Sequence, residues 1–321
     1  MRTIPALIAV AVLGTTLVAC SSPADPSHCT PTFPSGQTAS VVEATGRIGQ
    51  EPDVSFPTPL VTKSAQVTTV SAGDGSLLQS GEVADLQISL YAGTSGDLLT
   101  SSSYDEAEPV RRTVGAEDDM FAQAVECATV GSRVAFAATV EDIYGADQLN
   151  PELGLGNDDT LVAVIDVERG YLGKANGANQ LAENGLPAVV TAPDGRPGIS
   201  VPNQAPPADT RVSVLKRGDG TKVKEGDQVV AHYTGLVWDT GTVFQSSWDN
   251  GIPATLPAVS LEDDPQAGLV PGFADAIIGS TVGSQLLIVI APEDGYPEGS
   301  WPQGIPEGST MVFVVDVLGI Q

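Results

Sequence analysis

Few side chains in this chain could act as a nucleophile, a general base or a metal ligand. Its 321 residues include two histidines and three cysteines. His28 and His232 lie in different regions, and neither has Cys or carboxylate partners at metal-ligand spacing. There is also no Gly-x-Ser-x-Gly elbow and no glycine-rich phosphate loop. The sequence therefore predicts no metal, no cofactor, and neither hydrolase nor nucleotide chemistry.

The N-terminal segment has the pattern of a secretion signal. A short positive start precedes a largely apolar stretch, residues 4–19, that is too short to span a membrane. The stretch ends in Leu17-Val18-Ala19-Cys20, which resembles the lipobox of bacterial lipoproteins. The resemblance implies a signal peptide over residues 1–19, lipidation of Cys20 and a tether over residues 20–44. The protein would then be anchored to the cytoplasmic membrane and face outward, at the cell surface or on the periplasmic side. The alternative is an ordinary signal with a chance cysteine.

The other two cysteines are Cys29 and Cys127. In an oxidising compartment, two remaining thiols are more often paired than free. The sequence therefore predicts a Cys29–Cys127 disulfide that fastens the N-terminal segment to the first domain. The alternative is two unrelated buried thiols.

The composition is strongly acidic. Fourteen Lys and Arg stand against 40 Asp and Glu, for a net charge of −26, which excludes binding to a phosphate backbone. With 35 Gly, 24 Pro and 5% aromatic residues, the chain favours short strands and turns over long helices. From Glu225 to Gln321 there is no Lys or Arg, so we expect any cleft there to prefer neutral or basic segments.

An internal repeat organises most of the chain. Motifs recur at an offset of about 145 to 152 residues. Matched pairs include Gly73-Asp74-Gly75 with Gly218-Asp219-Gly220, Thr129-Val130-Gly131-Ser132 with Thr281-Val282-Gly283-Ser284, and Glu141-Asp142 with Glu293-Asp294. The repeat predicts two homologous domains, residues 45–170 and 195–321. Residues 171–194, rich in Gly, Ala, Asn and Pro, are predicted to be a linker.

The local patterns indicate an α+β fold. Residues 210–215, 228–234 and 310–318 are apolar and β-branched runs typical of strands. Only residues 273–278, between two glycines, suggest a helix, and it is short. We expect an antiparallel sheet curled over one small helix in each domain.

The second domain resembles the FKBP-type peptidyl-prolyl cis-trans isomerases over essentially its whole length. The resemblance rests on an ordered set of motifs: Val229-Val230-Ala231-His232-Tyr233-Thr234-Gly235, Phe244-Gln245-Ser246-Ser247, Val270-Pro271-Gly272-Phe273, Gly304-Ile305-Pro306 and Thr310-Met311-Val312-Phe313. It implies tandem FKBP-like domains, each a bent antiparallel sheet wrapped around a short helix.

The resemblance also implies an apolar pocket for a proline ring. The residues that would act in catalysis are Tyr233, Phe244, Gln245, Val270, Phe273, Tyr296 and Phe313. The residues that would contact the flanking substrate are Leu256, Leu269, Trp301 and Ile305. The Val270 N–H and the Tyr296 hydroxyl would make the polar contacts. Without the family pattern, Val270, Phe273 and Phe313 would be interpreted as ordinary core residues.

The implied function is X-Pro isomerisation that helps secreted proteins fold outside the cytoplasmic membrane. The implied partners are unfolded or proline-containing secreted polypeptides and macrolide inhibitors. Three departures from the family pattern predict reduced activity and an altered macrolide response: Gln245 in place of an Asp, Ala254 at a position that is often Phe, and Trp301 on the loop after Tyr296. The alternative is a non-catalytic chaperone or peptide-binding lipoprotein with the same fold.

The first domain lacks most of the implied pocket. It has Ile88, Leu99 and Ala163 at the positions of the second domain's Tyr233, Phe244 and Phe313. An acidic run, residues 117–119, replaces the apolar rim, although Phe121 and Tyr144 are kept. The sequence therefore predicts a degenerate first domain that does not catalyse the reaction.

Overall fold

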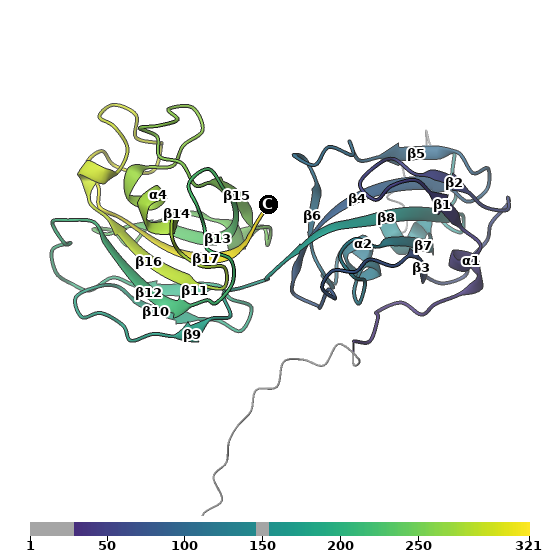
Figure 1. The fold of residues 1–321 in the computed structure, drawn as a ribbon, viewed down its shortest axis with the longest axis horizontal. Coiled ribbons are helices and arrows are strands. Elements are labelled where there is room, and N and C mark those ends of the chain that lie inside the picture. Colours follow the sequence, from purple (N-terminus) through teal and green to yellow (C-terminus); the bar gives the residue numbers. More distant parts are fainter. Residues whose placement is uncertain (1–28, 146–153) are drawn as a thin grey trace, which may run out of the picture.

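The computed structural model describes residues 29–145 and 154–321, which form two sheet-based units joined by one long strand (Figure 1). We call the described residues up to Tyr171 the first unit and residues 172–321 the second unit. Cys20, His28 and the predicted signal peptide lie outside the described residues. No helix in the described ranges has the length and apolar character needed to cross a membrane.

The first unit is built on a six-stranded antiparallel sheet in the order β3-β7-β8-β4-β5, with β6 also paired to β4. A separate hairpin is formed by β1 and β2. The elements are α1 (Gln37–Ser40), β1 (Glu43–Thr45), β2 (Asp53–Ser55), β3 (Gln66–Ser71), β4 (Val83–Ala92), β5 (Leu98–Ser101), β6 (Val110–Thr113), α2 (Met120–Ala124), β7 (Arg133–Thr139), α3 (Val140–Tyr144) and β8 (Thr160–Tyr171).

The second unit is built on a seven-stranded antiparallel sheet in the order β14-β13-β17-β16-β12-β9, with β15 also paired to β13. Its hairpin is formed by β10 and β11. The elements are β9 (Ala178–Asn179), β10 (Ala188–Thr191), β11 (Pro197–Ser200), β12 (Arg211–Arg217), β13 (Gln228–Val237), β14 (Val243–Ser246), β15 (Ala254–Pro257), α4 (Pro271–Ile277), β16 (Gln285–Ile290) and β17 (Met311–Ile320), with 3₁₀ turns at Ser247–Asp249 and Pro292–Asp294.

The two sheets share one strand order. Strands β3, β7, β8, β4, β5 and β6 occupy the places of β12, β16, β17, β13, β14 and β15. In each unit a short helix, α2 or α4, packs beside the sheet, on β7 or β16. The hairpin of each unit packs on a second apolar cluster. Val54 packs against the cluster that contains Val162 and Val164 in the first unit, and Val189 and Ile199 pack against the cluster that contains Leu287 in the second. The repeated motifs thus belong to two layered units of one topology.

The residues at the two ends of helix α4 explain where it begins and ends. Pro271 occupies the first turn, where its missing N–H costs no hydrogen bond. The helix ends before Gly279, whose φ of 87° lies in the left-handed region that glycine adopts without strain. The helix buries Phe273 and Ile277 against the sheet. The sequence predicted residues 273–278, so the helix begins two residues earlier and ends one residue earlier than expected.

Two segments differ from expectation because tertiary contacts order them. Of the predicted tether, residues 29–44 pack on the rest of the first unit, burying Ala39 and Val42. Cys127 is joined to Cys29 by a disulfide, with their Cα atoms 5.7 Å apart. The predicted linker, residues 171–194, contains the end of β8 and strands β9 and β10. Its Gly- and Pro-rich composition indicated a linker, but β9 pairs with β12 of the second sheet and β10 pairs with β11.

Candidate functional site

A cavity of about 180 Å³ opens in the second unit between β13, β14, β15, β17 and α4. It is lined by Tyr233, Phe244, Gln245, Leu256, Leu261, Gly268, Leu269, Val270, Phe273, Tyr296 and Phe313. All of the residues predicted to act in catalysis, and Leu256 and Leu269, are therefore brought together. Trp301 and Ile305 do not line the cavity.

Trp301 and Ile305 pack against residues that line the cavity. Ile305 is only 6% exposed and packs in the same hydrophobic cluster as Phe273. Trp301 packs edge-on against Tyr296, with 5.6 Å between ring centroids. That Trp301 and Ile305 contact the flanking substrate stays a prediction; in the structure Ile305 packs in the core and Trp301 packs on the Tyr296 ring.

Four aromatic rings form the cage of the cavity. The Phe273 and Phe313 centroids lie 5.0 Å apart with an interplanar angle of 88°, and Phe244 stands at 80° to Phe313 at 5.5 Å. Tyr233 is edge-on to Phe273 at 6.4 Å. Edge-to-face packing of this kind fixes ring orientations. The cage offers apolar ring surfaces of the size that a single proline ring can contact.

Gly235 allows the phenylalanine rings to meet over β13. A Cβ at Gly235 would lie 2.7 Å from ring atoms of both Phe244 and Phe313, closer than carbon atoms approach without a clash. Gly235 is paired with Phe313 on β17 and with Gln245 on β14. The sheet register thus places the glycine beneath the residues that need the space.

Polar groups at the cavity are few and are free to bind a ligand. Burial raises the pKa of Tyr233 and of Tyr296, so both phenols keep their protons at neutral pH. Within the described residues, neither hydroxyl takes part in a hydrogen bond, nor does the N–H of Val270. The Val270 carbonyl instead accepts from the N–H groups of Phe273 and Ala274, at 2.9 and 3.1 Å. These donors can orient a peptide, while Gln245 adds an exposed neutral amide.

Sequence reasoning did not identify Leu261 and Gly268 as site residues. They flank a polar loop that is closed by the Ser260–Leu269 bridge, and the Leu261 N–H donates to the Leu269 carbonyl at 2.7 Å. A Cβ at Gly268 would lie 2.4 Å from the Ser260 carbonyl oxygen. In the sequence, the available indication of a site residue was Leu261 itself, a single large apolar residue directly before the acidic residues 262–264.

The equivalent positions of the first unit lack this cage. Ala163 is fully buried, and Ile88 and Leu99 are half-buried aliphatic residues in the core cluster. Asp119 caps α2 by accepting from the N–H groups of Phe121 and Ala122, and it also pairs with Arg112 at 2.8 Å. The acidic residue therefore has a structural role at the place where the second unit has its apolar rim.

His232 lies next to Tyr233 on β13 but faces away from the cavity. It is 3% exposed and stacks on Trp248, with 3.8 Å between ring centroids. Its Nδ1 is 2.8 Å from the Ser247 hydroxyl. Burial, with a smaller contribution from the Arg196 cation, lowers the pKa of His232 from 6.5 to about 4.

We expect the lowered pKa of His232 to make stability depend on pH. Below pH 6.5 the unfolded chain binds a proton that the folded chain does not, so stability is full above that pH and is lost as pH falls to about 4. The loss is about 3 kcal/mol. Between pH 7 and pH 4, the free energy of unfolding should fall by about that much more in the wild type than in His232→Gln, measured by urea titration. Parallel pH profiles would contradict the assignment.

The site is thus a small apolar, aromatic pocket with a few oriented donors and no acid–base pair, a type of site suited to binding a compact ring. A family model described as FKBP-type peptidyl-prolyl cis-trans isomerase matches residues 219–318, within the second unit.

Three relatives are similar to this chain. A probable FK506-binding protein of Corynebacterium glutamicum is 35% identical over 125 residues, covering 38% of this chain and 97% of the relative. An FK506-binding protein of Streptomyces anulatus is 29% identical over 127 residues, covering 39% and 97%. The FKBP-type 22 kDa peptidyl-prolyl cis-trans isomerase of Escherichia coli is 37% identical over 107 residues, covering 33% and 48%. The chain belongs to the FKBP-type peptidyl-prolyl cis-trans isomerases and is an enzyme of that type.

Proposed function

We propose that the aromatic cavity of the second unit is the isomerase active site. The observation that carries this proposal is the convergence of Tyr233, Phe244, Phe273 and Phe313 from three strands and a helix on one small cavity. We also propose that the units are tandem FKBP-like domains, and that the first, with Ala163 in place of Phe313, does not catalyse the reaction.

The proposed mechanism is enclosure of the twisted amide. Rotation about an X-Pro bond has a barrier of about 18–20 kcal/mol because the planar amide is stabilised by resonance. The twisted form is less polar, so a dry cage stabilises it relative to the planar form. Phe244, Phe273 and Phe313 would enclose the proline ring. The Val270 N–H would bind a substrate carbonyl, and the Tyr296 hydroxyl would make a second polar contact.

The proposed role is to help secreted polypeptides fold past slow prolyl bonds, which isomerise in about 10–100 s without a catalyst. Lipidation of Cys20 would hold the enzyme on the outer side of the cytoplasmic membrane, in reach of chains that emerge there. Because two relatives are named for binding FK506, we propose that macrolides of that kind enter the same cavity.

One fractionation experiment tests activity and anchoring together. Cells producing the wild type or Cys20→Ser are separated into membrane and soluble fractions, and each fraction is assayed with a short peptide that has Leu before Pro. We expect wild-type activity in the membrane fraction and Cys20→Ser activity in the soluble fraction. If the activity of Cys20→Ser stays in the membrane fraction, the proposed lipid anchor at Cys20 is contradicted. Absence of activity where the intact protein is present contradicts catalysis and favours a binding role.

A further inference from the structure

Arg111 occupies a buried polar network in the first unit. It lies on β6, and its Nε and Nη2 donate to the two carboxylate oxygens of Asp85 at 2.7 and 2.9 Å. The Asp85 side chain is fully buried and that of Arg111 is 10% exposed. The Tyr171 hydroxyl donates to the same carboxylate at 2.9 Å, and the guanidinium lies over the Tyr171 ring at 5.3 Å. This arrangement fixes the guanidinium, because a bidentate pair allows one orientation.

The remaining nitrogen of Arg111 reaches the second unit. Its Nη1 donates to the Thr255 hydroxyl of β15 at 2.8 Å. Thr113, two residues along β6, donates from its hydroxyl to the Gly251 carbonyl at 3.0 Å, in the loop before β15. Arg111 and Thr255 occupy equivalent positions of the two units, since β6 pairs with β4 as β15 pairs with β13. The contact therefore joins equivalent edge strands.

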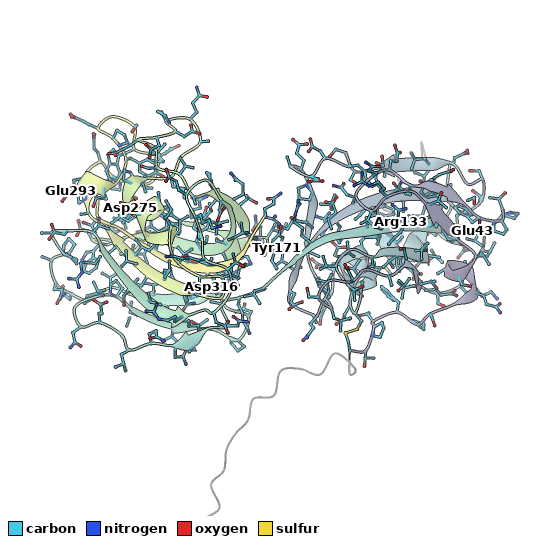
Figure 2. The ribbon with its side chains drawn as sticks, in the orientation of Figure 1. Glu43, Arg133, Tyr171, Asp275, Glu293 and Asp316 are labelled. Atoms are coloured by element: carbon cyan, nitrogen blue, oxygen red, sulfur yellow. A yellow bond between two sulfur atoms is a disulfide. The ribbon has the colours of Figure 1, made fainter. Side chains whose placement is uncertain are left out.

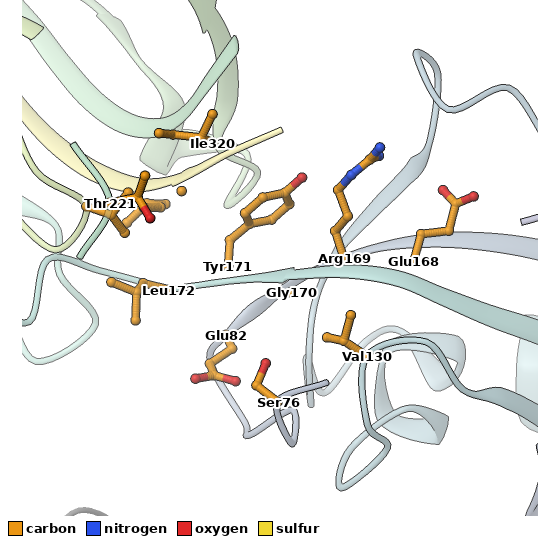
Figure 3. Close-up of a pocket in the computed structure, with 13 residues that line it drawn as sticks. Ser76, Glu82, Val130, Glu168, Arg169, Gly170, Tyr171, Leu172, Thr221 and Ile320 are labelled. Carbon is orange, nitrogen blue, oxygen red and sulfur yellow. The ribbon is translucent and has the colours of Figure 1, made fainter. Parts of the chain in front are cut away.

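Close apolar packing holds the units together at this junction. Val83 and Tyr171 of the first unit are buried in one cluster with Val230 and Leu318 of the second. A Cβ at Gly319 would lie 2.3 Å from the Tyr171 ring, so the ring rests on backbone. Figures 2 and 3 show Tyr171 at the end of β8, where the first unit meets the second. The polar network around Asp85 thus lies next to a close-packed apolar contact between the two units.

Strand β15 connects this junction to the cavity. In the described residues it pairs only with β13, over residues 254–257. Successive side chains of a strand point to opposite sides, so Thr255 faces the first unit while Leu256 lines the cavity. The chain that follows β15 supplies Leu261 and Leu269 to the same wall. A shift of β15 would therefore move the wall of the cavity.

We propose that Arg111 is a positioning residue for the isomerase site, acting through Thr255 to hold β15 and Leu256 against the bound substrate. The inference rests on the proposed location of the active site in this cavity. The first unit would then contribute to the reaction without a catalytic site of its own. Its Arg111 would hold β15, and therefore one wall of the cavity, in place before the substrate binds.

The test uses full-length variants and kinetics with a peptide that has Leu before Pro. Thr255→Val leaves the pairing of Arg111 with Asp85 intact but removes the hydroxyl that accepts from Arg111 and that also donates to the Gln321 side chain at 3.3 Å. We expect it to raise KM roughly threefold to tenfold, the worth of one hydrogen bond, with kcat little changed. Thr255→Ser, which keeps the hydroxyl, should restore the wild-type KM. Arg111→Ala should have a similar effect, and adding Thr255→Val to it should cause no further loss.

Matched controls separate positioning from general damage. Thr69→Val makes the same chemical change at an exposed position of β3 and should leave KM unchanged. A wild-type KM in Thr255→Val, equal losses in the Val and Ser variants, or additive losses with Arg111→Ala would each overturn the proposal. If Thr255→Val has no effect while Phe244→Ala loses activity, only the positioning role fails. If Phe244→Ala keeps full activity, the location of the active site fails.

Discussion

Replacing Phe244 by alanine is expected to lower kcat/KM for X-Pro isomerisation about 10- to 100-fold. The Phe244 ring is half-buried at the edge of the cavity and packs on Phe313 at 5.5 Å. Its removal withdraws apolar surface that the proline ring would cover, worth about 1.5–3 kcal/mol for an aromatic side chain. The measurement is kcat/KM for a short peptide with Leu before Pro, with folding checked by circular dichroism.

The first unit offers a matched control for Phe244→Ala. Leu99 occupies the equivalent position there and is also half-buried. Leu99→Ala should leave kcat/KM unchanged, because the cavity lies in the second unit. Equal losses in both variants would show that activity depends on packing in general. Full activity of a folded Phe244→Ala would place the reaction elsewhere.

Replacing Arg133 by alanine is expected to destabilise the first unit by about 3–5 kcal/mol, the usual cost of leaving one buried charge without its partner. Arg133 and Asp166 form a bidentate pair at 2.6 and 2.7 Å, with both side chains 1% exposed. The guanidinium also donates to carbonyl groups at the end of β1 and in the turn that follows it, at residues 45–47 and 50. Figure 2 shows Arg133 among the strands of the first unit.

The second unit suggests the control for Arg133→Ala. There Gln285 takes the equivalent place and donates to Asp316 at 2.8 Å, so Arg133→Gln should lose less stability than Arg133→Ala. Arg211→Ala, which breaks an exposed pair with Glu183, should cost about 0–1 kcal/mol. All three tryptophans lie in the second unit, so hydrogen exchange is the suitable probe, of β7 and β8 amides for the Arg133 variants and of β12 and β16 amides for Arg211→Ala. Equal stability of Arg133→Ala and Arg211→Ala would contradict the expectation.

The sequence was most informative where local pattern and tertiary structure agree. Residues 228–234 and 310–318 are apolar β-branched runs; the first lies within β13, and the second lies within β17 except for residue 310. Family motifs pointed to Tyr233, Phe244 and Phe313, which meet in one cavity. Motifs of this kind carry the spacing that the sheet register requires, so the aromatic cage was accessible from sequence.

The remaining features depend on contacts between distant segments. Strand β9 has two residues and pairs with the end of β12. It is too short to show a periodic pattern of apolar residues in the sequence. Leu261 enters the cavity because a bridge closes its loop. The bond between Arg111 and Thr255 requires the placement of one unit against the other, which motifs within one repeat do not contain.

The hairpins that cover the two sheets extend the internal repeat beyond the sheets themselves. Strand β1 begins at Glu43 and β10 at Ala188, and each pairs with a strand, β2 or β11, that lies at the repeat offset. The repeated unit is therefore a sheet together with its covering hairpin. Strand β10, which begins at Ala188, is the first described strand of the second unit that has a counterpart, β1, at the repeat offset.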